Sequence, residues 1–192
     1  MLKNKLLWFI ALANAFVYMV RYGCLDWAPT ILKGNGFDWK STGWAYFAYE
    51  IAAIPGTILC GWLSDKFFKG KRALPTILFM ALVLVFVVLL WLNVDNFKMV
   101  IVCLIGIGFF IYGPVMLIGV HALDLAPKNA AGTAAGLTGF FGYFLGTFIL
   151  ANTVIGWVYG LTKGWDIPFI LIIAACLLSM VFMGLTLREE RK

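Results

Sequence analysis

Six long apolar stretches leave this chain with very few possible folds. Each is close to or above the roughly 20 residues that an α-helix needs to cross the hydrocarbon core of a bilayer. They cover residues 6–32, 42–63, 73–92, 99–123, 131–159 and 167–187. Hydrophobic residues make up 63% of the 192 residues and charged residues 12%, whereas a soluble domain carries about 45–50% and about 25%. The sequence therefore predicts an all-α membrane protein, a bundle of six transmembrane helices with no soluble domain.

The first apolar stretch begins in a way that resembles a secretory signal peptide. Lys3 and Lys5 precede the apolar run, and Ala13-Asn14-Ala15 has the form of a cleavage site. The apolar run continues well past Ala15, however, and cleavage there would leave a helix too short to span the membrane. We therefore expect this stretch to be the first transmembrane helix.

The positive charges lie mainly in the predicted loops and indicate an orientation. The formal net charge of +6 can indicate a nucleic-acid partner, but membrane topology explains it here, and we expect no such partner. Because cytoplasmic loops are enriched in Lys and Arg, the distribution predicts a protein of the plasma membrane (bacterial inner membrane) with both termini in the cytoplasm. The cytoplasmic side would carry Lys3, Lys5, Lys66, Lys69, Lys71, Arg72, Lys128, Arg188, Arg191 and Lys192, and the other side Lys33, Lys40, Lys98 and Lys163.

The sequence offers little that could support catalysis or bind a metal. The four cysteines all lie inside apolar stretches, without a CxxC pair or a neighbouring histidine, and are interpreted as buried free thiols: Cys24, Cys60, Cys103 and Cys176. The single histidine, His121, is expected to be a hydrogen-bonded residue at a helix interface rather than a proton relay. No nucleophile elbow or phosphate-binding glycine loop occurs. We therefore expect no enzyme, no metal and no cofactor.

Glycine and proline within the stretches predict how the helices pack. The fifth stretch contains two GxxxG pairs with a further glycine between them, a spacing that lets a second helix approach closely: Gly132, Gly136, Gly139, Gly142 and Gly146. Pro55-Gly56 and Gly113-Pro114 are expected to bend the second and fourth helices.

Three charged residues interrupt the apolar stretches, where polar residues are costly and most often functional: Arg21, Asp26 and Glu50. Arg21 lies about 22 Å along its helix, and Asp26 is about 140° further around it, so Arg21 is expected to point toward another anion. Tyr18 shares the helix face of Arg21, and a guanidinium beside a phenol suits a tetrahedral oxyanion. The alternative is a structural arginine bonded to helix carbonyls. Asp26 and Glu50 outnumber the single deep cation, so they are expected to need basic partners from another surface.

Several motifs resemble those of one transporter family. Residues 18–27, Tyr-Met-Val-Arg-Tyr-Gly-Cys-Leu-Asp-Trp, are similar to the seventh helix of the organophosphate:phosphate antiporters, which belong to the major facilitator superfamily. The resemblance continues through residues 44–50, 54–62, 111–122 and 125–136 and so covers nearly the whole chain. Residues 61–72 resemble the cytoplasmic loop signature of the superfamily, with Gly61, Asp65, Lys66, Gly70, Lys71 and Arg72.

The resemblance implies a fold, an activity and a set of site residues. It implies that residues 1–192 form one domain, the C-terminal six-helix half of a twelve-helix carrier whose partner is the N-terminal six-helix half. The implied activity is exchange of glycerol-3-phosphate, an organophosphate, for inorganic phosphate across the lipid bilayer. In such a carrier Arg21 would bind the phosphate group together with an arginine of the N-terminal half, and Asp26 and Glu50 would pair with a lysine of that half. The cavity wall would include Tyr18, Tyr112 and Tyr143.

Three other interpretations remain open at the level of the sequence. The chain could be an organophosphate sensor, since related receptors bind sugar phosphates in order to signal, or it could be an inactive fragment. It could also be a six-helix carrier that dimerises, so that two copies of Arg21 face each other. Measured flux, as opposed to binding alone, distinguishes a carrier from a sensor.

Overall fold

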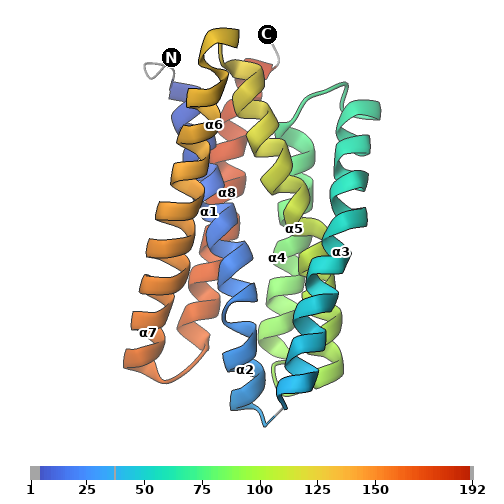
Figure 1. Cartoon of the computed structure of the whole chain (residues 1–192), viewed down its shortest axis with the longest axis vertical. Helices are drawn as coiled ribbons and strands as arrows, with labels where there is room; N and C mark the ends of the chain where they lie inside the picture. The colour runs from blue at the N-terminus through green and yellow to red at the C-terminus, as the bar shows by residue number, and fades with distance from the viewer. Residues whose placement is uncertain (1–4, 37, 191–192) are drawn as a thin grey trace.

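Six helical crossings make up the chain, as the sequence predicts. The structure, a computed structural model, describes residues 5–36 and 38–190, and no strand occurs within these ranges. Six helices are long and apolar enough to cross a membrane: Lys5–Gly34, Thr42–Lys66, Ala73–Leu92, Phe97–Leu125, Lys128–Thr162 and Asp166–Leu187. The prediction of an all-α bundle with six transmembrane helices is thus confirmed (Figure 1).

The helices stand side by side along the long axis of the bundle (Figure 1). The main ones are α1 (Lys5–Leu25), α3 (Trp39–Lys66), α4 (Ala73–Leu92), α5 (Phe97–Leu125) and α8 (Asp166–Glu190). α1 begins and α8 ends at the same end of the bundle, called the terminal end below. Three of the basic residues used to predict the orientation, Lys3, Arg191 and Lys192, lie outside the described residues.

The first crossing is broken near its far end. α1 ends at Leu25, and a short helix α2 (Ala28–Gly34) follows, with Pro29 in its first turn. Proline fits that place because the first turn of a helix leaves its N–H groups unpaired in any case. The Trp27 indole nitrogen donates a 2.9 Å hydrogen bond to the carbonyl oxygen of Ala151 and fixes the break against the fifth crossing. The break places Asp26 directly after the end of α1.

The fifth crossing changes its helical geometry along its length. After the short 3₁₀ turn η1 (Lys128–Ala130), it consists of α6 (Ala131–Phe140), the π-helical segment η2 (Phe141–Val154) and α7 (Ile155–Thr162). The buried residues of η2 are Gly142, Gly146 and Ala151, spaced four and five apart. In an α-helix, Ala151 would lie about 180° around from Gly142. The wider i→i+5 turn of a π-helix keeps all three on one face, which packs against α1.

The predicted glycine contacts form at one GxxxG pair only. A Cβ atom on Gly146 would overlap the carbonyl oxygen of Ala15, and one on Gly142 would press against the Tyr18 ring, so this pair gives α1 its close approach. At Gly132, Gly136 and Gly139 a Cβ atom would meet no described atom within 4 Å. The expected contact of the first pair is therefore not made among the described residues.

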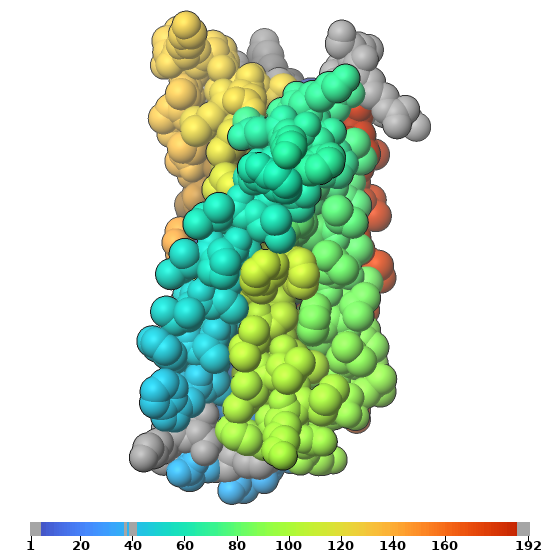
Figure 2. All heavy atoms as spheres, turned by 90° about the vertical axis from the view of Figure 1, so that its right-hand side faces the viewer, coloured from blue at the N-terminus to red at the C-terminus, as the bar shows by residue number. Residues whose placement is uncertain are grey.

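α3 and α5 make the other close helix pair. A Cβ atom on Gly56 would overlap the carbonyl oxygen of Phe109, and one on Gly108 would overlap that of Tyr49. Figure 2 shows α3 crossing one face of the bundle, with part of α5 beside it. Both helices continue through their internal prolines, Pro55 and Pro114, so the bends expected there stay predictions.

Candidate functional site

The guanidinium group of Arg21 lies among aromatic rings in the middle of the bundle. Its Cζ atom is 4.1 Å from the ring centroid of Tyr112, 4.7 Å from that of Tyr22 and 5.9 Å from that of Tyr18. A cation within about 6 Å of an aromatic ring is attracted by the ring quadrupole, more strongly where water is excluded. Among the described residues no ion pair includes Arg21. Its charge is therefore stabilised mainly by cation–π contacts with these rings.

A chain of two short hydrogen bonds connects Arg21 to Glu50. The Nη2 atom of Arg21 donates to the Tyr112 hydroxyl at 2.6 Å, and this hydroxyl donates to Oε2 of Glu50 at 2.5 Å. Bonds of this length are typical of hydrogen bonds that involve an ionised partner. They join α1, α5 and α3 at one point, and the phenol stands between the half-buried cation and the carboxylate. The expectation that Arg21 points away from Asp26 agrees with this geometry.

One donor of Arg21 is still unused. Its Nε atom is buried and has no hydrogen-bond partner among the described residues. A buried donor without a partner costs about 1–3 kcal/mol, and this cost would be recovered if a bound oxyanion or a water accepted from it. The site is thus polar and cationic, and its Nε donor lacks a hydrogen-bond partner among the described residues.

Tyrosine rings extend the site toward the fifth crossing. The ring centroids of Tyr18 and Tyr143 are 4.9 Å apart, and those of Tyr22 and Tyr143 are 6.4 Å apart. Tyr18 is buried, whereas Tyr143 has an exposed fraction of 55% and forms the open edge of the cluster. The four substrate-binding residues predicted from the sequence, Arg21, Tyr18, Tyr112 and Tyr143, therefore gather at one place.

Two further tyrosines belong to this cluster and were not among the residues predicted from the sequence. Tyr22 follows Arg21 directly and stacks under its guanidinium. Tyr49 is fully buried, and its hydroxyl donates to the backbone carbonyl oxygen of Arg21 at 3.4 Å. The adjacency of Tyr22 to Arg21 was a usable signal, but no sequence pattern pointed to Tyr49.

The two acidic residues of the site differ in their surroundings. Glu50 accepts from Tyr112, as described above, while the carboxylate of Asp26 is hydrogen-bonded by the side chain of Asn152 on η2. Neither carboxylate forms an ion pair with a described Lys or Arg. The expected pairing of both with a lysine from another surface stays a prediction.

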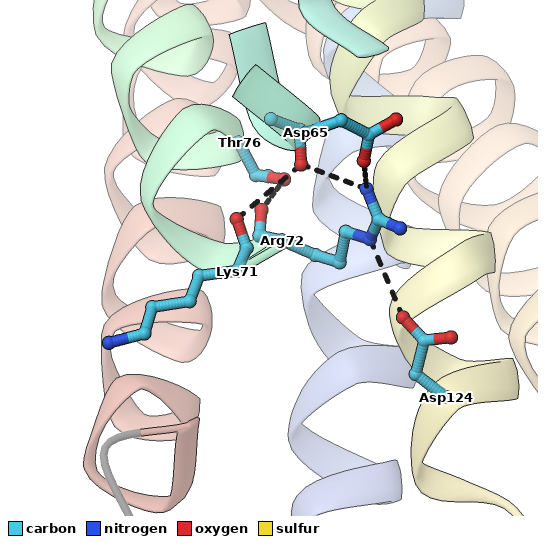
Figure 3. Close-up of polar contacts among 6 residues, drawn as sticks. Asp65, Lys71, Arg72, Thr76 and Asp124 are labelled. Carbon is cyan, nitrogen blue, oxygen red and sulfur yellow. Dashed lines mark hydrogen bonds and ion pairs between the residues drawn. The ribbon is translucent and has the colours of Figure 1, made fainter. Parts of the chain in front are cut away.

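A second polar site lies at the terminal end and contains the loop signature. Arg72 lies between two carboxylates (Figure 3). Its Nη1 atom is 2.6 Å from Oδ1 of Asp65 and 3.0 Å from the Ser64 hydroxyl, and its Nε atom is 3.4 Å from Oδ2 of Asp124. Burial alone would lower the pKa of Arg72, but the hydrogen bonds and charges of the two carboxylates hold this pKa above its ordinary value. The network ties α3 and α5 to the loop that precedes α4.

The other signature residues surround this network. Gly61 packs near the Met116 side chain, and Lys66 lies over the Trp62 ring at 4.6 Å. Gly70 has a φ of 78°, which favours glycine because it lies in the left-handed region. Lys71 points away from Arg72 (Figure 3). No sequence pattern indicated Asp124, the second acidic partner of Arg72.

Residues 1–151 match the family model of the Major Facilitator Superfamily. The chain belongs to this superfamily. It is 56% identical over 96% of its length to a glycerol-3-phosphate transporter of Bacillus subtilis, and 50% identical over its whole length to one of Haemophilus influenzae. It is also 34% identical over its whole length to a hexose-6-phosphate:phosphate antiporter of Salmonella typhimurium. The chain spans only 42%, 43% and 42% of the lengths of these three relatives.

The two crossings with the smallest buried share flank the Arg21 cluster. Only 28% of the most apolar part of the Thr42–Lys66 and Lys128–Thr162 crossings is buried, against 61% for the Lys5–Gly34 crossing that lies between them (Figure 1). Both crossings expose large apolar side chains, including Trp44, Phe47, Ile51, Phe140, Phe144 and Phe148.

Proposed function

We propose that this chain is the C-terminal half of an organophosphate:phosphate antiporter and carries half of its central binding site. The observation that supports this most strongly is the Arg21 cluster, a half-buried cation with an unused donor among tyrosines, next to the least covered helices. The names of the relatives support glycerol-3-phosphate as the substrate and inorganic phosphate as the exchanged ion. Transport, rather than catalysis, is the activity proposed.

In this proposal Arg21 binds the phosphate group. The planar guanidinium can donate two parallel hydrogen bonds to a phosphate, and neighbouring phenols add further donors. Tyr18, Tyr112 and Tyr143 form the wall of the cavity on this side. Glycerol-3-phosphate carries between one and two negative charges near neutral pH, since the second pKa of such a phosphate is about 6. One arginine cannot neutralise that charge in a low-dielectric site, so we infer a second cation from the N-terminal half.

The exchange follows if the two halves rock against each other around a site near the middle of the membrane. The exposed apolar surfaces of α3 and the fifth crossing would then contact the N-terminal half and the lipid. A test uses labelled glycerol-3-phosphate and phosphate-loaded proteoliposomes that contain this chain, either alone or with the N-terminal half of the Bacillus subtilis relative. Uptake is expected only when both halves are present.

Each other outcome of this test favours a different interpretation. Robust uptake by this chain alone would contradict the half-carrier proposal and support a self-dimer in which two copies of Arg21 meet. Saturable binding without uptake by the two halves together would support a sensor instead.

Asp26 and Glu50 are proposed to pair with a lysine of the N-terminal half. Removing one member of a buried pair leaves the other charge stranded, which is strongly destabilising. In the two-half carrier, Asp26→Asn is therefore expected to lower uptake by at least tenfold, because breaking a buried pair costs about 3–5 kcal/mol. Uptake should recover in part when the partner lysine is also neutralised. Asp95→Asn, which removes the same charge from an exposed loop, is the control and should change little. Undiminished uptake by Asp26→Asn would exclude the pair for this residue.

The orientation proposed from the charge distribution places the terminal end in the cytoplasm. Single cysteines introduced as Lys69→Cys and Asn96→Cys test it, because these residues lie in loops at opposite ends and the four native cysteines are buried. A membrane-impermeant maleimide added to intact cells is expected to label the Asn96→Cys variant. The Lys69→Cys variant should react only after permeabilisation. Labelling of both from one side would contradict the six-crossing topology itself.

A further inference from the structure

A cavity lies at the terminal end, away from the Arg21 cluster. It has a volume of about 300 Å³ and opens between the loop that joins α3 to α4 and the last turns of α5. It is lined by Lys69, Gly70, Lys71, His121, Asp124 and Leu125. This volume lies at the lower end of the range of small-ligand pockets, so a compact group such as a phosphate has room in it.

The charge of this cavity is not balanced by its own acidic residues. Both carboxylates nearby, Asp65 and Asp124, are already engaged by Arg72. Lys69 and Lys71 are exposed, and neither forms an ion pair with an acidic side chain within the part of the chain that the structure describes. Figure 3 shows Lys71 directed away from the Arg72 network. Two lysines therefore line a cavity whose one carboxylate, Asp124, is shared with Arg72.

The backbone of the loop holds the two lysines in place. Lys69 and Gly70 both have left-handed φ angles, 53° and 78°. The Gly70 amide donates to the carbonyl oxygen of Ser64 at 3.0 Å, and the Lys71 amide donates to that of Phe68 at 3.0 Å. The loop is therefore a fixed turn that presents the lysines at the rim of the cavity.

Neighbouring aromatic residues mark the depth of this loop in the membrane. Trp62 and Phe67 are exposed, and the ammonium group of Lys66 lies 4.6 Å and 5.8 Å from their ring centroids. Exposed tryptophan beside lysine at the end of a transmembrane helix is typical of the level of the lipid headgroups. The basic cavity thus lies at the level where lipid phosphates are found.

We propose that this cavity binds a phosphate-bearing anion through Lys69 and Lys71, with the phosphodiester of an anionic lipid as its first candidate. Basic pockets between transmembrane helices at a membrane surface bind anionic lipid headgroups by the same chemistry. Free inorganic phosphate offers the same oxyanion, so the test includes it. The site is separate from the proposed transport site and does not depend on transport.

The test counts lipids retained by the whole purified chain in native mass spectrometry, with phosphatidylglycerol and phosphatidylcholine offered in turn. Lys69→Gln/Lys71→Gln is the test variant. Lys98→Gln/Lys163→Gln is the control, because it removes the same charge at the other end and Lys163 has a left-handed φ of 54°, close to that of Lys69. Each lysine near a membrane surface contributes roughly a factor of five, so the test variant is expected to bind phosphatidylglycerol about 25-fold more weakly.

The outcomes separate the two sources of phosphate. Retention of phosphatidylglycerol over phosphatidylcholine that depends on Lys69 and Lys71 but not on the control lysines supports a lipid site. In an Arg21→Gln background, binding of inorganic phosphate that is lost with the same two lysines supports the site with a free anion as its ligand. Equal binding by the wild type and the test variant, or equal losses in the test and control variants, would overturn the proposal.

Discussion

Replacement of Arg21 by lysine is expected to reduce glycerol-3-phosphate uptake by the two-half carrier by about 10- to 100-fold. Lysine keeps the positive charge but has no planar fork, so it can neither bind a phosphate bidentately nor stack on three tyrosine rings in the same way. The loss of one hydrogen bond to a charged group amounts to about 1.5–3 kcal/mol, which gives the expected range. The bond from Nη2 of Arg21 to Tyr112 would also be disturbed.

Initial uptake rates into phosphate-loaded proteoliposomes measure this effect, normalised to the amount of folded carrier. Arg188→Lys makes the same substitution near the end of α8, away from the proposed binding site, and should keep its uptake. Full uptake by Arg21→Lys would show that Arg21 acts as a point charge or as a structural residue, which was the alternative that the sequence left open.

A methyl group added at Gly146 is expected to lower the stability of the bundle strongly. The Cβ atom of Gly146→Ala would overlap the backbone carbonyl oxygen of Ala15, which cannot move aside as the end of a flexible side chain could. α1 and η2 would have to separate, and overpacking of this kind costs about 1–3 kcal/mol or more. For a chain of this length the melting temperature in detergent should fall by roughly 5–10 °C.

Gly136→Ala provides the matched control for this change. It adds the same methyl group to the other GxxxG pair of the same crossing, where no described atom lies within 4 Å of the new Cβ. Its melting temperature should equal that of the wild type or rise slightly, since alanine favours a helix more than glycine does. Equal losses in both variants would mean that helix propensity, and not the contact with α1, sets the effect.

The crossings could be predicted from the sequence because the thickness of the bilayer sets the length of each apolar stretch. A span of about 20 apolar residues is visible without knowledge of any neighbour, so all six crossings were found. The hydrogen-bond partner of Arg21 was not predicted, because Tyr112 lies 91 residues further along the chain. Glu50, which accepts from Tyr112, lies on a third helix. Helix periodicity excluded Asp26, but it contains no information on which residue of another helix completes the contact.

The π-helical segment also escaped prediction, for a related reason. Periodicity indicates helix geometry only where one face is apolar and the other polar. In η2 both the lipid-facing and the packed residues are apolar or small, as Phe144 and Phe148 on one side and Gly142 and Gly146 on the other show. The hydropathy pattern therefore does not indicate the wider turn, although this turn places Ala151 beside Trp27.

The single proton of the Tyr112 hydroxyl sets a limit on what the Arg21 cluster can do at one time. A phenol has one hydrogen to donate, and here it is given to Glu50 while the oxygen accepts from Arg21. A phosphate oxygen that takes this hydrogen therefore takes it from Glu50, and the carboxylate is left to find another donor. In such a complex the phosphate gains a donor and Glu50 loses one, through rotation of the Tyr112 hydroxyl about its C–O bond.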